Sequence, residues 1–296
     1  MSFTRAVRFG FSAMTVLAVV LMASPAWAQD PPVVVIAGAL DVTNQYNFRG
    51  IRQNTEGVSI QPYVDFGFTP FRGDGGLKTV GVNLGTWNAF HSQIDDFTNL
   101  DGEITSNKWY ESDVYATLGL GFSKAALAFT YTSYTSPADL FAHVKELAIK
   151  ASFDDSSMLG KGALKPYALV AFELDDDGQA DGGTEKGTYI ELGVAPGVSG
   201  SRASLAIPIK VGLSANSYYE QNMGTAARPN FEDSTFGYFS IAGIVTVPMG
   251  PHANIHGGVE VQTFGDTLKA KNLFGDDPAD PSSSTVIGSI GIGFSF

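Results

Sequence analysis

Alternation of apolar and polar residues with a period of two runs through most of this chain. In the segment 113–122, Val114, Leu118 and Phe122 fall on one face, whereas Asp113 and Tyr115 fall on the other. This period is typical of β-strands that have one apolar and one polar face. Twelve such strands are predicted, at 38–52, 57–69, 78–90, 108–122, 124–135, 140–153, 164–174, 186–198, 202–214, 235–248, 252–264 and 285–296.

The connections between these strands alternate in length. The odd-numbered ones become long, as at 91–107, 175–185 and 215–234, whereas most even-numbered ones are short. Outer-membrane barrels have short periplasmic turns and long extracellular loops, and closure removes the unpaired strand edges that lipid cannot satisfy. The chain is therefore predicted to be all-β, an antiparallel transmembrane β-barrel of about twelve strands. A soluble β-sandwich is the alternative.

The N-terminus resembles a secretory signal peptide. Arg5 and Arg8 precede an apolar stretch, and Ala26 and Ala28 form a small-residue cleavage pattern. We expect cleavage after Ala28; an uncleaved anchor is the alternative. The predicted organisation is a signal peptide at 1–28, a short N-terminal segment at 29–37 and a single outer-membrane barrel at 38–296.

Aromatic residues mark two rims on the predicted outer face, as in membrane barrels. Near the short turns these are Phe66, Phe68, Phe122, Phe153, Phe294 and Phe296. Near the long loops they are Tyr46, Phe48, Tyr110, Tyr131, Phe172 and Phe239.

The opposite face of the strands carries charge, which predicts a polar lumen. Eight acids and three bases are expected to line it and to set its selectivity: Asp41, Arg49, Asp65, Glu111, Asp113, Glu146, Lys150, Glu173, Glu191, Lys210 and Glu260. An excess of five acids is easier to hydrate than to bury, so a water-filled lumen is expected. Acidic rings select cations, and the long loops are acidic as well.

Composition excludes several classes of function. The net charge of −12 disfavours a nucleic-acid partner, and the absence of cysteine excludes disulfides and thiolate chemistry. His252 and His256 are four apart, a spacing that on a strand is too wide to share a metal ion. No catalytic arrangement, metal site or cofactor is predicted. A weak Ca²⁺ loop at 175–185 is less expected than a solvated acidic loop.

The segment LDVTNQYNFRGIRQNTEGVSIQPYVDFGF at 40–68 resembles the opening of the TorF-type porin family (Gcw_chp). TVGVNLGTWNAF, FTYTSYTSPADLFAHVKELAIKASF and GTYIELGV are similar to later segments of that family, in the same order. The resemblance implies an outer-membrane channel and supplies no catalytic residues. The terminal GIGFSF, with Phe294 and Phe296, resembles the assembly signal of outer-membrane barrels.

Two functions follow from these patterns. The first is a porin-like channel of the bacterial outer membrane for passive diffusion of small hydrophilic solutes, with a preference for cations. The second is a non-conducting structural or adhesive barrel. The expected partners are outer-membrane lipid and lipopolysaccharide, the outer-membrane assembly machinery and the permeating solutes.

Overall fold

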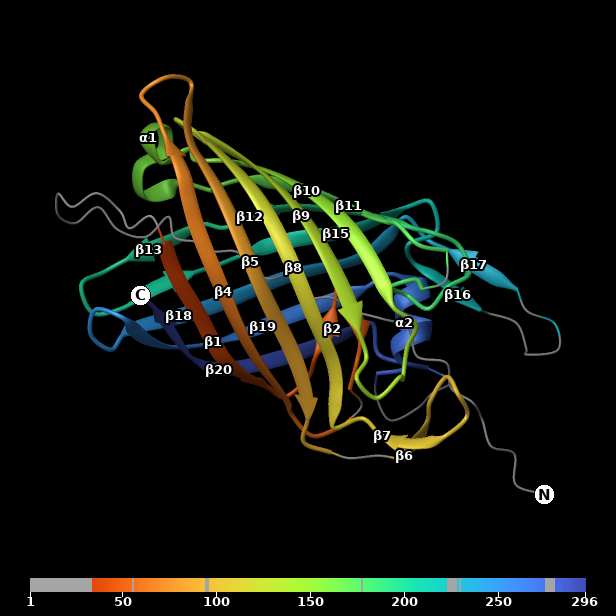
Figure 1. The fold of residues 1–296 in the computed structure, drawn as a ribbon. Coiled ribbons are helices and arrows are strands. Elements are labelled where there is room, and N and C mark those ends of the chain that lie inside the picture. Colours follow the sequence, from red (N-terminus) through yellow and green to blue (C-terminus); the bar gives the residue numbers. More distant parts are fainter. Residues whose placement is uncertain are drawn as a thin grey trace.

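The computed structural model describes residues 34–54, 56–93, 96–176, 178–222, 228, 230–274 and 280–296. These residues form a closed barrel (Figure 1). The predicted signal peptide at 1–28, its cleavage site and residues 29–33 lie outside the described residues. The barrel begins at Val34, four residues before the predicted start at 38.

Twelve antiparallel strands build the wall, as the sequence predicts. They are β1 (Val34–Thr43), β4 (Ser59–Arg72), β5 (Leu77–His91), β8 (Trp109–Phe122), β9 (Ala125–Thr135), β10 (Val144–Phe153), β11 (Tyr167–Glu173), β12 (Thr188–Val194), β15 (Ile209–Ala215), β18 (Phe236–Pro248), β19 (Ala253–Phe264) and β20 (Ser284–Ser295). Each strand pairs with its neighbours, and β1 pairs with both β4 and β20. The barrel is therefore closed, and the predicted fold class is confirmed.

The long connections gather at one end of the barrel, which we call the loop end (Figure 1). They carry the small elements β2 (Asn47–Phe48), β3 (Ile51–Arg52), β6 (Asp96–Thr98), β7 (Ile104–Ser106), β16 (Glu220–Asn222), β17 (Phe231–Asp233) and α2 (Asp266–Asn272). The opposite turn end carries short connections and one longer one, which contains α1 (Ser156–Leu159) and η1 (Gly160–Gly162). Among the residues that the structure describes, no helix is long and apolar enough to cross a membrane.

Two prolines interrupt neighbouring strands at the same level. β12 stops before Pro196 and resumes as β13 (Gly197–Ser199), and β14 (Ser204–Ala206) stops before Pro208, after which β15 begins. The backbone N–H of Ile207 donates to the carbonyl of Pro196. The interruptions face each other, so one irregular step accommodates both residues that lack a backbone donor.

The outer surface of the barrel is apolar. All six aromatic residues predicted for the rim at the turn end are exposed, between 36% for Phe294 and 64% for Phe296. At the loop end, Tyr131, Phe172 and Phe239 are exposed as predicted. An apolar, aromatic-bordered exterior around a polar interior is the pattern of a barrel that spans a membrane.

Three aromatic residues predicted for the outer rim are inside instead. Tyr46 and Phe48 are buried because the chain leaves the wall after Thr43, whereas the sequence predicts one strand over 38–52. Tyr110 is buried because the β5–β8 pairing shifts register between Ala89 and Phe90. Such a bulge adds one residue to a strand and reverses the face of those beyond it.

Candidate functional site

A hairpin between β1 and β4 fills the loop end of the lumen. Its strands β2 and β3 pair only with each other within the described sheets. The side chains of Phe48 and Ile51 are 0% and 1% exposed, although they lie in a connection rather than in the wall. The hairpin therefore has the burial of a core element.

The hairpin contacts the barrel wall on several sides. The Tyr46 hydroxyl donates to Glu111 on β8 at 3.0 Å, and the Asn47 amide donates to Gln262 on β19 at 2.9 Å. Its central residue Arg49 reaches β10 and β12. Contacts with strands so far apart in the barrel place the hairpin across the lumen.

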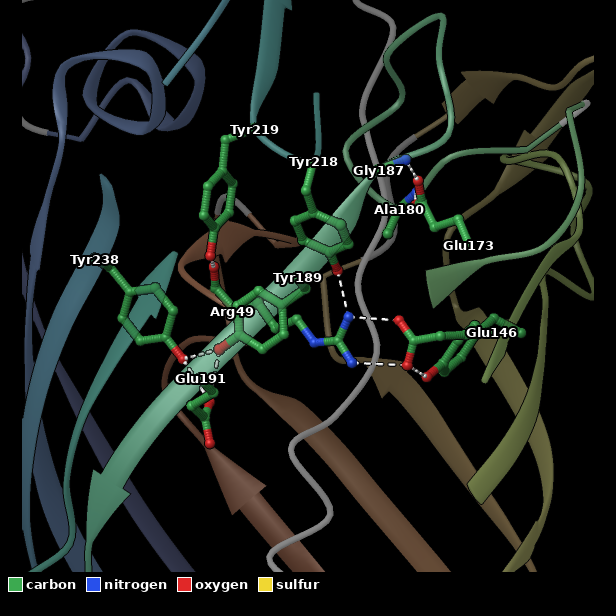
Figure 2. A network of polar contacts seen from close by, with 11 residues as sticks. Arg49, Glu146, Glu173, Ala180, Gly187, Tyr189, Glu191, Tyr218, Tyr219 and Tyr238 are labelled. Carbon is green, nitrogen blue, oxygen red and sulfur yellow. Dashed lines mark hydrogen bonds and ion pairs between the residues drawn. The ribbon is translucent and has the colours of Figure 1, made fainter. Parts of the chain in front are cut away.

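Arg49 forms the centre of this packing (Figure 2). Its guanidinium donates two hydrogen bonds to the Glu146 carboxylate, at 2.5 and 2.8 Å, and is 2.6 Å from the Tyr218 hydroxyl. It also lies 4.5 Å from the ring centroid of Phe48 and 4.2 Å from that of Tyr189. A buried bidentate ion pair between aromatic rings fixes both the position and the direction of the hairpin tip.

The turn of the hairpin requires glycine. Arg49 and Gly50 have φ values of +46° and +83°, and positive φ at both central residues is the feature of type I′ hairpin turns. A Cβ on Gly50 would lie 2.9 Å from Leu268 and Tyr238. Arg49 is strained in this region, and its many partners hold it there.

Two segments of the loop end donate hydrogen bonds to the backbone of the hairpin. The Tyr219 hydroxyl donates to the carbonyl of Arg49 at 2.9 Å. Asn272, the last residue of α2, donates to the carbonyl of Gly50 at 2.7 Å and accepts from the backbone N–H of Arg52 at 2.9 Å. We call α2 together with the segment 215–222 the cover of the hairpin.

A polar cluster ties this cover to the neighbouring loop. The Asp181 carboxylate accepts backbone hydrogen bonds from Gly183 and Glu220, at 2.7 and 2.5 Å. The Glu220 carboxylate accepts from the backbone and the hydroxyl of Thr184. Burial raises the pKa of Asp181 to about 6, and burial lowers the pKa of the neighbouring Lys271. The cluster therefore contains a carboxyl that titrates near neutral pH.

Below the hairpin, tyrosine hydroxyls surround a second buried carboxylate. Tyr167, Tyr189 and Tyr238 donate to Glu191 at 2.8, 2.6 and 3.2 Å. Three donors compensate a carboxylate that is only 1% exposed. Most tyrosines of the chain lie inside the barrel, although only three of them contact Glu191. The inward tyrosines are Tyr46, Tyr63, Tyr110, Tyr115, Tyr134, Tyr167, Tyr189, Tyr218, Tyr219 and Tyr238.

Toward the turn end, the inward polar side chains are partly exposed. His256 contacts Asp41 at 2.6 Å, and both side chains are 21% exposed. The Asp65 carboxylate accepts from the Asn83 amide at 2.7 Å and from the Tyr115 hydroxyl at 3.1 Å. This region, the turn-end lumen, is polar and reached by solvent.

Two lysines lie on the other wall of the turn-end lumen. Lys210 is 3.9 Å from Glu260, with side-chain exposures of 16% and 25%. The Lys150 ammonium lies 4.3 Å from the ring centroid of Tyr167. These are loose contacts, unlike the tight pair at Arg49.

The structure places ten of the eleven predicted lumen residues on inward positions of the wall: Asp41, Asp65, Glu111, Asp113, Glu146, Lys150, Glu173, Glu191, Lys210 and Glu260. Arg49 is the exception because it belongs to the hairpin turn. The expectation that these acids are hydrated is wrong for five of them. Glu111, Asp113, Glu146, Glu173 and Glu191 are at most 6% exposed. The hairpin contacts Glu111 and Glu146, wall tyrosines surround Glu191, and the backbone of the loop after β11 donates to Glu173.

The histidines do not converge. The ring of His252 stacks on Phe296 at 5.1 Å, whereas His256 faces Asp41 inside the barrel. His91 is 3% exposed and stacks on Tyr110 at 4.7 Å. Within the described ranges no group of three or more His, Asp and Glu side chains is arranged to hold a metal ion.

Apart from Arg49, which is a predicted lumen residue, sequence reasoning missed the packing residues of the hairpin and its cover. Tyr218 and Tyr219 stand in a long polar connection, and Leu268 stands in another. An aromatic pair in an otherwise polar loop is a signal that these side chains are buried. The contribution of Asn272 has no comparable signal, because a single asparagine is common in loops.

Comparisons with known proteins give a likeness of fold. No family model and no curated protein matches the chain, so the resemblance to the TorF-type family is unconfirmed. Among solved structures, the chain is similar to the NanC porin at 10% identity, over 88% of this chain and 98% of that one, with a TM-score of 0.41. It is similar to an outer-membrane channel from Pseudomonas putida F1 at 9% identity, over 93% and 100%, with a TM-score of 0.45. It is also similar to outer membrane phospholipase A from Escherichia coli at 10% identity, over 87% and 92%, with a TM-score of 0.42.

Proposed function

We propose that this protein is a channel of the bacterial outer membrane for passive diffusion of small hydrophilic solutes. The observation that carries the proposal is the closed barrel with an apolar outer face and a polar, solvent-reached turn-end lumen. An apolar exterior of this kind is typical of barrels that span a lipid bilayer. The segments that resemble the TorF-type family agree with this proposal, which assigns no catalytic role.

The proposal includes a preference for cations. Acids outnumber bases among the lumen residues, and two of the three bases are partly neutralised: Arg49 by Glu146 and Lys210 by Glu260. The solvent-reached acids Asp41 and Asp65 are in position to act on a passing ion. Acidic side chains in a narrow passage with low-dielectric walls favour cations.

Planar bilayer recordings test both parts. We expect stepwise single-channel currents and a zero-current potential in a KCl gradient that indicates preference for K⁺. An anion-selective zero-current potential would overturn the cation preference and leave the channel standing.

The second candidate, a non-conducting structural or adhesive barrel, is favoured by one observation. The hairpin and its cover pack the loop end as tightly as a protein core. Complete electrical silence of a folded barrel, including a variant without the hairpin, would favour this alternative.

The proposed location also implies export and assembly partners. We propose cleavage of the signal peptide after Ala28, contact with lipid and lipopolysaccharide, and recognition of the last strand by the assembly machinery. Phe294 and Phe296 are outward and exposed, as such a signal requires. Deleting Phe296 should reduce the heat-modifiable protein recovered from outer membranes. Deleting Phe231, also 40% exposed but in a loop strand, is the control.

A further inference from the structure

The hairpin is an addition to the barrel and not a part of its wall. β1 and β4 pair with each other up to Thr43 and Ser59, the residues from which the connection departs. The hairpin strands contribute no hydrogen bond to either barrel strand in the described ladders. The wall can therefore remain closed when the hairpin leaves the lumen.

The hairpin tip is charged, whereas the tip of a permanent plug is expected to be apolar. An apolar tip would lose its stabilisation on exposure to water. Here the tip is Arg49, paired with Glu146 and capped by the Tyr218 hydroxyl, and all three groups can be hydrated. A buried ion pair gains little over its hydrated partners, because desolvation offsets the attraction. Docked and released states of such a tip are closer in free energy than those of an apolar plug.

The cover has the same character. It holds the hairpin through hydrogen bonds to the backbone carbonyls of Arg49 and Gly50, in addition to the apolar contact of Leu268 at Gly50. Lys271 lies within this cover, and Asp181 of the neighbouring loop accepts a hydrogen bond from Glu220 of the cover; the charges of both side chains also favour hydration. Release of the hairpin requires the cover to move with it, since α2 overlies Gly50.

We propose that the hairpin 46–53 is a gate that is closed in this structure, and that Arg49 is the latch that holds it against Glu146. The proposal rests on the channel function and adds regulation to it. Undocking transfers the guanidinium and the carboxylate to water and opens the loop end to the turn-end lumen. No covalent change is required.

The main experiment compares four proteins in planar bilayers. These are the wild type, Arg49→Gln, a control Lys150→Gln, and a variant in which 46–53 is replaced by a short Gly-Ser linker. Lys150 is a lumen cation whose described contact is with Tyr167 rather than with the hairpin, so it controls for the loss of one charge. Heat modifiability in detergent gels confirms that each barrel is folded.

We expect the wild type to be closed most of the time. The linker variant should be open continuously, and Arg49→Gln should raise the open fraction of time by about tenfold or more. Lys150→Gln should have the open fraction of the wild type, and only its conductance or ion selectivity should change. Equal steady currents in the wild type and the linker variant would overturn the gate but not the channel.

Other outcomes separate the remaining claims. A folded linker variant that never conducts would overturn the channel itself. An Arg49→Gln variant with wild-type openings, beside a conducting linker variant, would overturn the role of Arg49 as latch.

A second measurement does not depend on removing the latch. The chain has no cysteine, so Asn47→Cys with Gln262→Cys provides one defined pair, at positions whose side chains are hydrogen-bonded. A cleavable bifunctional thiol reagent that bridges the two should abolish openings, and reduction should restore them. Openings that persist after complete cross-linking would overturn the gate.

Discussion

The two ends of the lumen use the same residue types in different surroundings. At the loop end, Arg49 and Glu146 form a tight ion pair with side chains 5% and 2% exposed. At the turn end, Lys210 and Glu260 lie 3.9 Å apart with exposures of 16% and 25%. The wall strands that carry Glu146, Lys210 and Glu260 alternate in the same way, whereas Arg49 lies in the hairpin turn. The difference comes from the hairpin, which removes water from one end only.

The comparison predicts a large difference in stability. Glu146→Ala leaves Arg49 without its carboxylate, and loss of one partner of a buried pair costs about 3–5 kcal/mol. We expect about 3 kcal/mol in the free energy of unfolding, because release of the hairpin returns Arg49 to water. Urea unfolding in lipid vesicles measures it.

Glu260→Ala is the matched control for this loss. Its pair with Lys210 is loose and partly solvated, so we expect about 0–1 kcal/mol. Equal losses in both variants would mean that the two ends of the lumen are equally solvated.

The hairpin turn gives a second contrast. Gly50→Ala introduces a Cβ 2.9 Å from Leu268 and Tyr238 at a φ of +83°. Backbone strain alone costs about 1–2 kcal/mol at a left-handed position. Gly102 has the same φ and no atom within 4 Å of its Cβ position, so Gly102→Ala isolates the strain. Proteolysis of the hairpin should increase in Gly50→Ala only.

The turn end should control selectivity more than the buried acids do. Asp41→Asn with Asp65→Asn should move the zero-current potential toward zero, because these carboxylates are reached by solvent. The pair Asp113→Asn and Glu191→Gln, buried beneath the hairpin, should change it less while the hairpin is docked. The opposite order would place the selective passage at the loop end.

The smallest expected effect is a pH dependence of the cover. The pKa of Asp181 is raised to about 6 in the folded loop, so the folded loop binds this proton more tightly than the unfolded chain does. The resulting stabilisation is present below about pH 4 and is lost as pH rises through 6. Protease resistance of the segment 178–187 should therefore increase as pH falls from 7 to 5, and Asp181→Asn should remove this dependence.

The wall of the barrel could be predicted from the sequence because strand alternation has a fixed period. Residues such as Asp65 and Glu191 follow from that period alone, as do exposed residues such as Phe66. The filling of the lumen could not be predicted. In NFRGIR the apolar residues Phe48 and Ile51 are three apart, which interrupts the period of two, and Gly50 favours a turn. Neither signal shows that this turn folds into the lumen.

The bulge near Tyr110 could not be predicted from the sequence for a similar reason. One additional residue exchanges the faces of Trp109 and Tyr110, and an aromatic pair satisfies either arrangement. Which carboxylates are buried depends on tertiary contacts with the hairpin, with wall tyrosines and with the loop after β11, and these contacts have no periodic signature. The sequence therefore predicts a lumen that is filled with water along its whole length, whereas in the structure the loop end of the lumen is packed.

The positions of two tryptophans give the barrel a built-in optical readout. Trp87 is fully buried, and its ring lies 5.2 Å from that of Tyr46 at the base of the hairpin. Trp109 is 45% exposed on the outer face, where it stacks on Phe90. Brominated lipid should quench the emission of Trp109, and aqueous iodide should reach Trp87 only when the lumen admits it. Fluorescence of the unlabelled protein in vesicles can therefore separate events inside the barrel from events at its lipid surface.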